Sequence, residues 1–115
     1  MEEVRGIGTC EIEMKVVGRL HKPRHFFSYQ VHKGQVIVLG GCLTSGEPLR
    51  STELIDCNGA REEQVSVTMN KTVFPEMIKK RHMHQSLILG GRYLYVFFGM
   101  SSETLLTRSI ECLDL

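Results

Sequence analysis

Hydrophobic residues in this chain gather in short runs rather than at helical spacing. Residues 35–39 and 93–98 are almost continuously apolar, which is typical of strands covered on both faces. Residues 26–31 and 85–89 form a second pair of apolar runs just upstream, and a glycine-containing turn joins each to its partner. Glycines supply the positive φ that tight hairpin turns need. The pattern therefore predicts two antiparallel hairpins.

Further strand patterns flank these hairpins. Residues 51–56 and 109–114 have similar sequences and are predicted as third strands. Asn58-Gly59 is a strong hairpin signal, and it leads into residues 65–69, whose alternation predicts a fourth strand. Residues 10–17 alternate in the same way and are predicted as another outer strand.

The chain repeats itself at a spacing of 58 residues. Seven identities fall in the same order at that spacing, without a gap. They are Ser28 with Ser86, Val38 with Val96, Gly41 with Gly99, Arg50 with Arg108, Ser51 with Ser109, Glu53 with Glu111, and Asp56 with Asp114. Four antiparallel strands per repeat at this period indicate an all-β fold, namely a partial β-propeller of about two blades.

The repeats resemble those of kelch-type β-propellers. In that family a glycine pair ends the second strand, and a Ser/Thr-x-Glu-x-Tyr-Asp third strand follows a variable loop. Residues 40–41, 51–56 and 109–114 carry this pattern, and Arg24 and Arg81 match the family's arginine before the first strand, with a one-residue shift. The resemblance implies structural roles for seven residues. They are Gly40, Gly41, Glu53, Asp56, Gly99, Glu111 and Asp114.

The chain departs from the kelch pattern at three points. It has no tryptophan, it has Phe98-Gly99 in place of the second glycine pair, and Ile55 and Leu113 replace the tyrosine of the third strand. These departures leave the subfamily unassigned.

The repeat also divides the chain. Residues 1–23 are predicted as an N-terminal segment that holds an outer strand of a preceding blade. Residues 24–80 form the first kelch repeat, and residues 81–115 form a second repeat, truncated after its third strand. A propeller needs about four to eight blades, so the predicted ring is incomplete. Three interpretations remain open: a fragment of a longer protein, copies that assemble into a ring with residues 10–17 completing a neighbour's last blade, or an open pair of sheets.

The bulk composition narrows the partners and the location. The 115 residues carry a formal net charge of +1, with 42% hydrophobic and 23% charged residues. A near-neutral chain has no electrostatic footprint for nucleic acid or an anionic membrane. The sequence has no recognisable secretory signal or bilayer-spanning apolar run, which favours a cytoplasmic location. In that compartment the four cysteines, Cys10, Cys42, Cys57 and Cys112, are expected to be free thiols in the core.

Loops on one face of a repeat array commonly form its binding surface. Here the connections 42–50, 70–80 and 100–108 share one edge of the predicted blades. The predicted function is that of a protein-interaction module, which binds another protein through the loops between strands two and three and between strand four and the next strand one. The predicted partner-binding residues are Arg50, Phe74, Lys79, Lys80, Arg81 and Arg108. Phe74 is the best anchor, with packing beneath the loop as the alternative.

No motif in the chain predicts catalysis, and no cofactor is expected. His82 and His84 would share one face of a strand, with the distant His25 as a further metal ligand. Hydrogen-bonded histidines are the simpler interpretation. Glu53 and Glu111 are paired only by the repeat, so a structural role is favoured over acid–base chemistry. The alternatives are a fragment of a kelch-type propeller enzyme, such as a metal-dependent oxidase or a sugar isomerase, and a remnant without independent function.

Overall fold

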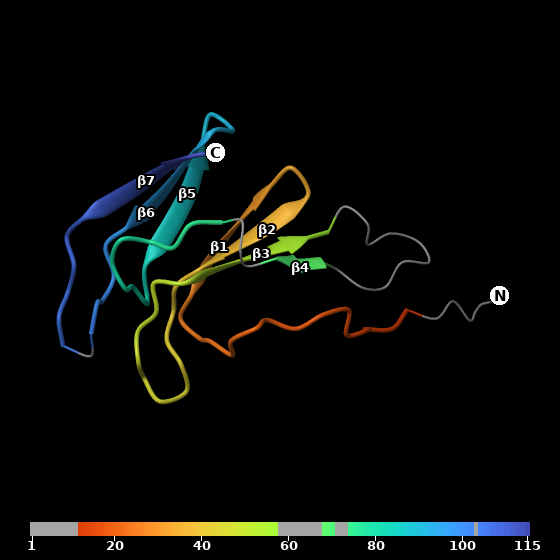
Figure 1. The fold of residues 1–115 in the computed structure, drawn as a ribbon, viewed down its shortest axis with the longest axis horizontal. Helices are drawn as coiled ribbons and strands as arrows, with labels where there is room; N and C mark the ends of the chain where they lie inside the picture. Colours follow the sequence, from red (N-terminus) through yellow and green to blue (C-terminus); the bar gives the residue numbers. More distant parts are fainter. Residues whose placement is uncertain (1–11, 58–67, 71–73, 103) are drawn as a thin grey trace, which may run out of the picture.

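The chain folds as two antiparallel β-sheets (Figure 1). The computed structural model describes residues 12–57, 68–70, 74–102 and 104–115, and no helix occurs within these ranges. The first sheet has the strand order β1-β2-β3-β4, and the second has the order β5-β6-β7. The strands are β1 Ser28–His32, β2 Gln35–Leu39, β3 Thr52–Asp56, β4 Thr68–Asn70, β5 Gln85–Leu89, β6 Tyr93–Phe97 and β7 Ile110–Asp114. The predicted all-β class is confirmed.

Both hairpins lie where the hydrophobic pattern predicts them. β2 and β5 have the predicted bounds. β1 begins two residues later than predicted, because Phe26 has a left-handed backbone with a φ of 56° that cannot continue a strand. A fourth strand pairs antiparallel with β3. The Asn58-Gly59 turn and residues 65–67 lie outside the described residues.

The two hairpins differ by one residue at their turns. Residues 33–34 join β1 to β2, whereas residues 90–92 join β5 to β6. Equivalent positions are therefore 57 residues apart before the turn and 58 after it. The strand register aligns Ser28 with Gln85 rather than with Ser86. The gapless alignment of the two repeats is thus wrong at the first strand, since a turn residue is inserted between the matched segments.

The hydrophobic core lies between the two sheets, which approach each other along β1 and β5. It contains Ile37, Leu39 and Leu54 of the first sheet, Met77 of the connecting segment, and Leu94 and Val96 of the second sheet. Successive side chains of a strand point to opposite faces. β2 therefore sends Ile37 and Leu39 toward the second sheet, while Val36 and Val38 face the other way.

The two central strands are not equally covered. β2 is buried or half-buried along its whole length, as its apolar sequence predicts. β6 is buried only at Leu94 and Val96, whereas Tyr93, Tyr95 and Phe97 keep part of their surface open to solvent. Burial on both faces is therefore wrong for β6, because within the described residues no third sheet packs on its outer face.

Residues 12–20, which precede the first sheet, form no strand. Ile12, Met14 and Val16 alternate as predicted, yet all three are exposed and none belongs to a strand. The predicted outer strand is thus not formed among the described residues of this segment. Leu20, further along, lines a groove against Val36 and Ile55 of the first sheet. Only this later part of the segment packs on the sheet.

Candidate functional site

The β2–β3 and β6–β7 connections lie at the same end of the molecule, opposite the hairpin turns (Figure 1). The two loops have the same internal pairing. The isolated bridges join Cys42 to His25 and Pro48, and Met100 to His82 and Leu106. The start of each loop is therefore paired with two segments: the residues that precede the first strand of the same sheet, and the last residues of the loop itself.

A glycine at the start of each loop makes this pairing possible. Gly41 and Gly99 both have a φ of 92°, a backbone conformation that residues with a Cβ rarely adopt. A Cβ on Gly41 would lie 2.6 Å from the His25 carbonyl oxygen, and one on Gly99 would lie 2.8 Å from the His82 carbonyl oxygen. Both loops therefore need glycine for close backbone approach as well as for conformation.

The residue before each glycine differs between the repeats for a structural reason. Gly40 and Phe98 both have a left-handed backbone, with φ of 62° and 55°. A Cβ on Gly40 would lie 2.6 Å from the Arg81 carbonyl oxygen, because the second sheet packs on this point. The exposed Phe98 occupies the equivalent position of the second sheet. The first sheet therefore needs glycine here, whereas the second accommodates a large side chain.

Arg24 joins three parts of the first sheet through one guanidinium group. Its Nη1 donates to the carbonyl oxygens of Gly40 at 2.9 Å and Ser51 at 3.0 Å. Its Nη2 donates to Glu53 Oε2 at 2.8 Å, and both side chains are buried. The Glu53 carboxylate also accepts the backbone amides of His21 and Lys22. The ion pair thus ties the entering segment, the loop and β3 together.

Arg81 repeats this arrangement in the second sheet. Its Nη1 donates to the carbonyl oxygens of Phe98 and Ser109, both at 2.9 Å, and its Nη2 donates to Glu111 Oε2 at 3.0 Å. Glu111 accepts the backbone amides of Ile78 and Lys79. The match of Arg24 with Arg81 across a one-residue shift is therefore present in three dimensions.

The burial of Arg81 corrects one predicted site residue. Arg81 is 0% exposed, and its guanidinium group is occupied by the loop and by Glu111. It therefore does not lie on the binding surface predicted for it. A buried charge is stable only when it is paired and hydrogen-bonded, which is the role that this network provides.

The other predicted partner-binding residues divide into two groups. Lys79, Lys80 and Arg108 are exposed, and Arg50 Nε forms a solvent-exposed ion pair with Glu76 at 3.4 Å. Phe74 is half-buried and packs against the hydrophobic core, so the alternative of packing beneath the loop applies to it. The structure thus keeps four of these side chains at the surface, all of them cationic.

The third strands end on aspartates with different exposure. Asp114 is exposed and accepts two hydrogen bonds from Arg92, with an Nε–Oδ1 distance of 2.8 Å. Asp56 is half-buried at the end of β3. Both lie at the hairpin-turn end of their sheets, away from the loops.

The tips of the two loops enclose a shared groove that sequence reasoning did not single out. Its volume is about 470 Å³. It is lined by Ser45, Gly46, Glu47 and Pro48 of the first loop and by Ser102 and Thr104 of the second. Its described lining residues are mostly small, and Glu47 supplies the carboxylate among them. Two loops of the same repeat position could have been expected to meet, but their separation depends on how the sheets pack.

The histidines lie at the junction between the sheets. His82 and His84 are both buried, and His84 Nε2 lies 2.8 Å from Ser28 Oγ of the first sheet. Burial, together with the nearby Arg81, lowers the pKa of His84 to about 4. Burial likewise lowers the pKa of His82. Both imidazoles are therefore neutral at pH 7, and across the described residues no group of three His, Cys, Asp or Glu converges for a metal ion.

The described cysteines have unequal environments. Cys42 is buried, with its Sγ 3.3 Å from His25 Nε2, and burial raises the pKa of its thiol. Cys57 is half-buried and Cys112 is exposed, so the expected core position is wrong for Cys112. Cys112 is opposite Tyr95 in the register of β6 and β7, so the two side chains share the face of the second sheet that turns away from the first. Cys10 lies outside the described residues.

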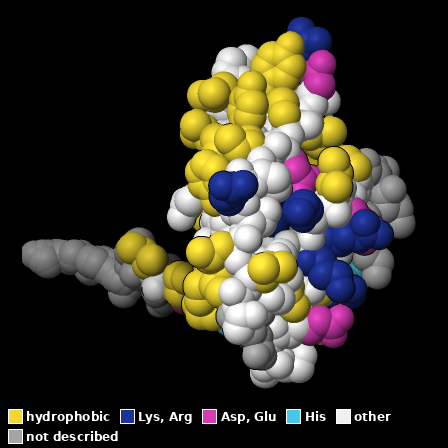
Figure 2. Space-filling model, turned by 90° about the vertical axis from the view of Figure 1, so that its left-hand side faces the viewer, with side chains coloured by type: hydrophobic (Ala, Val, Ile, Leu, Met, Phe, Trp, Pro, Cys, Tyr) yellow, Lys and Arg dark blue, Asp and Glu magenta, His cyan; other side chains and the backbone are white. Residues whose placement is uncertain are grey.

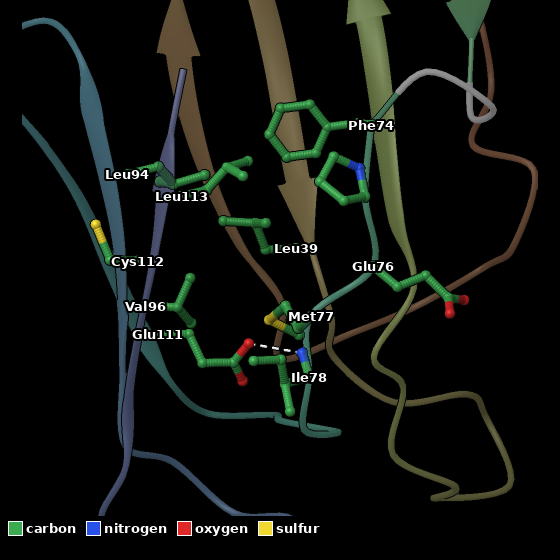
Figure 3. Close-up of a pocket in the computed structure, with 11 residues that line it drawn as sticks. Leu39, Phe74, Glu76, Met77, Ile78, Leu94, Val96, Glu111, Cys112 and Leu113 are labelled. Atoms are coloured by element: carbon green, nitrogen blue, oxygen red, sulfur yellow. Dashed lines mark hydrogen bonds between the residues drawn. The ribbon is translucent and has the colours of Figure 1, made fainter.

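An apolar cavity of about 180 Å³ lies between the sheets (Figure 3). Leu39 of the first sheet, Leu94 and Leu113 of the second, and Phe74 and Met77 of the connecting segment point into it. At its edge the Glu111 carboxylate accepts the Ile78 amide at 2.6 Å. The cavity is thus a space in the packing between the sheets, closed by residues of both.

Comparison of the sequence with models of known protein families finds no match, and comparison with curated proteins finds none either. Within the described ranges, no helix is long and apolar enough to cross a membrane.

Proposed function

We propose that the chain is a pair of kelch-type propeller blades that acts as a protein-interaction module. The repeated Arg24–Glu53 and Arg81–Glu111 networks support this assignment, because each joins the same three parts of its sheet. The stacking of two antiparallel sheets along their first strands also suits adjacent blades of a propeller.

The groove between the loop tips carries the proposal. It is formed by equivalent loops of two successive sheets, and loops held by a rigid scaffold are common binding surfaces. Glu47 lines the groove, while Arg50 and Arg108 are exposed where their loops rejoin the third strands. A partner segment with small polar side chains and a cationic group beside Glu47 fits this wall.

A binding experiment tests the groove directly. The immobilised chain is incubated with extract of its source cell, and the retained proteins are quantified by mass spectrometry. The variant Thr104→Arg fills the groove with a long cationic side chain. The matched control is Arg92→Ala, which changes an exposed residue at the opposite end of the second sheet.

A specific partner is retained by the unaltered chain and by the control, and its retention by Thr104→Arg falls about tenfold or more. Retention that is equal for all three chains, or absent for all three, contradicts binding in the groove. Recovery of the chain itself does not count, since the groove is proposed to bind a different protein.

A further inference from the structure

The second sheet turns a largely apolar face away from the first sheet. This downstream face carries Leu87, Leu89, Tyr93, Tyr95, Phe97 and Ile110. Leu87 is 45% exposed, and Figure 2, which looks onto this side of the molecule, shows hydrophobic side chains over much of its upper half. The strand register makes Tyr95 and Phe97 equivalent to Ile37 and Leu39, which are buried between the sheets. The downstream face is therefore equivalent to the face of the first sheet that the second sheet covers.

A groove of about 620 Å³ continues this face at the loop end, with Met83, Phe98, Gly99, Thr107 and Arg108 among its lining residues. The equivalent place on the first sheet holds the connecting segment. There the Gly41 amide donates to the Arg81 carbonyl oxygen at 2.8 Å, and the Arg81 amide donates to the Leu49 carbonyl oxygen at 3.0 Å.

The corresponding polar groups of the second sheet are the Gly99 amide and the Thr107 carbonyl group. Within the described part of the chain, neither makes a backbone hydrogen bond of this kind. A segment that resembles the connecting segment would satisfy both groups. In the internal contact both groups are paired by the amide and the carbonyl oxygen of one residue, Arg81, so the incoming segment needs one residue with both backbone groups free.

Such a segment exists at the other end of the molecule. Residues 17–24 are the repeat equivalents of residues 74–81, so Leu20 corresponds to Met77 and Val17 to Phe74. Val17 and Leu20 line a groove of about 270 Å³ with Val36 and Ile55. This groove is equivalent to the cavity between the sheets. The difference is that Leu39 of the first sheet covers the cavity, whereas no equivalent residue covers the groove among the described residues.

The first sheet therefore has an apolar face of its own, turned away from the second sheet. This upstream face carries Val17, Leu20, Tyr29, Val31, Val36 and Ile55. Tyr29 is 60% exposed. Its equivalent in the second sheet, Ser86, is half-buried and accepts a hydrogen bond from Gln30 of the first sheet. The upstream face is thus equivalent to the surface by which the second sheet docks on the first.

We propose that the downstream face of one copy binds the upstream face of a second copy of this chain. The contact reproduces, between molecules, the one that joins the two sheets within the molecule. The two faces differ, so the association is head to tail, and it continues until a ring closes or a filament forms. The proposal rests on the two faces alone and does not depend on the loop groove.

The internal contact predicts which residues meet. Gln30 donates from its Nε2 to the Ser86 carbonyl oxygen at 3.0 Å within the chain. The equivalent pair between copies is Leu87 with Tyr29 of the second copy, an apolar pair in place of a polar one. Phe98 stands where the first sheet has Gly40, and a Cβ on Gly40 would lie 2.6 Å from the Arg81 carbonyl oxygen, so the contact between copies requires the incoming backbone to move away from Phe98.

Sedimentation of the full chain tests the association, over about 5 to 500 µM, the range in which a moderate protein contact is populated. The unaltered chain is expected to sediment as a monomer at the low end and as larger species at the high end. Leu87→Asp and Tyr29→Asp each place a charge on one exposed face, and each weakens association at least about 30-fold. Leu105→Asp, which places the same charge on an exposed loop residue outside both faces, leaves it unchanged.

Mixing the two variants distinguishes head-to-tail contact from other association. Leu87→Asp retains a sound upstream face and Tyr29→Asp a sound downstream face, so the mixture forms a one-to-one dimer and nothing larger. This complementation also shows that both variants are folded. A monomeric unaltered chain across the whole range, a mixture that stays monomeric, or variants that associate like the unaltered chain would each overturn the proposal.

Discussion

Arg81 and Glu111 form an ion pair inside the second sheet whose geometry repeats that of Arg24 and Glu53 in the first. The Nη2–Oε2 distances are 3.0 and 2.8 Å. In both sheets the carboxylate also accepts two backbone amides from the segment that enters the sheet. A complete network that recurs with every partner in place indicates that the two sheets are copies of one structural unit.

Removing one partner of this network destabilises the fold. Arg81→Met leaves the Glu111 carboxylate without its cation and frees two carbonyl groups, at an expected cost of about 3 to 5 kcal/mol in the free energy of unfolding. A small domain has roughly 5 to 15 kcal/mol in total, so the variant is close to unfolding. Urea denaturation followed by circular dichroism measures the loss.

The matched control for this substitution is Arg92→Ala. Arg92 and Asp114 form a pair of similar geometry, but both side chains are exposed and solvent screens their attraction, so its loss is expected to change the free energy of unfolding much less than Arg81→Met does. Equal effects of the two substitutions would show that the buried network contributes no more than a surface pair.

The stability of the fold depends on pH through His84. Its pKa is about 4 in the fold, chiefly because of burial, against 6.5 for the ordinary side chain. The depressed pKa means that the unfolded chain binds the proton more tightly. Stability is therefore complete above about pH 6.5 and falls as the pH decreases toward 4, by about 3 kcal/mol from this group. Urea denaturation at several pH values between 7 and 4 measures the slope.

The substitution His84→Phe isolates that contribution, since Phe27 occupies the equivalent position in the first repeat. The stability of the His84→Phe variant is expected to change much less between pH 6.5 and 4 than that of the unaltered chain. The control is His32→Gln, at the end of β1, whose stability is expected to fall with pH as in the unaltered chain. An unchanged slope in His84→Phe would assign the acid sensitivity to other groups.

A comparison of Gly41→Ala with Gly90→Ala separates two contributions to the loss of stability: steric contact of the new Cβ and strain of the backbone. Both glycines have positive φ, which costs an alanine roughly 1 to 2 kcal/mol. Only Gly41 is enclosed, since a Cβ there would lie 2.6 Å from the His25 carbonyl oxygen, whereas a Cβ on Gly90 meets nothing within 4 Å. We expect Gly41→Ala to lower the melting temperature clearly more than Gly90→Ala. Similar shifts for the two would mean that the loop moves aside without cost.

Thiol labelling tests the different exposure of Cys112, in the second sheet, and Cys42, at the start of the β2–β3 loop. Cys112 is exposed and reacts rapidly with a thiol reagent in dilute solution, whereas Cys42 is buried and the pKa of its thiol is raised. Peptide mass spectrometry after timed labelling should find Cys112 modified at least about tenfold faster. Rapid modification of Cys42 in the native protein would contradict its buried position.

Hydrophobic patterning predicted the strands well because each strand is defined by residues close in sequence. The runs at 35–39 and 85–89 coincide with β2 and β5. The spacing between the two repeats was harder to predict from the sequence. The inserted turn residue is recognised only from the strand register, in which Gln85, and not Ser86, lies opposite Phe97 at the end of β6. A chance serine identity favoured the wrong alignment.

The candidate site was less predictable because it depends on packing between sheets. An arginine is usually at the surface, so nothing local distinguishes the buried Arg81 from the exposed Arg108. The groove between Glu47 and Thr104 joins residues far apart in the chain and requires the relative position of two loops. Likewise, the exposure of Cys112 follows from what covers β7, which no residue of that strand encodes.

The second sheet rests on the first through a contact that is tied together by the chain itself. A tether of this kind holds its two ends at an effective concentration of the order of millimolar. The internal junction therefore stays closed at any dilution, even if the same contact between separate molecules dissociates. The contact within the chain and the proposed contact between chains thus use equivalent surfaces but respond differently to dilution: only the contact between chains dissociates.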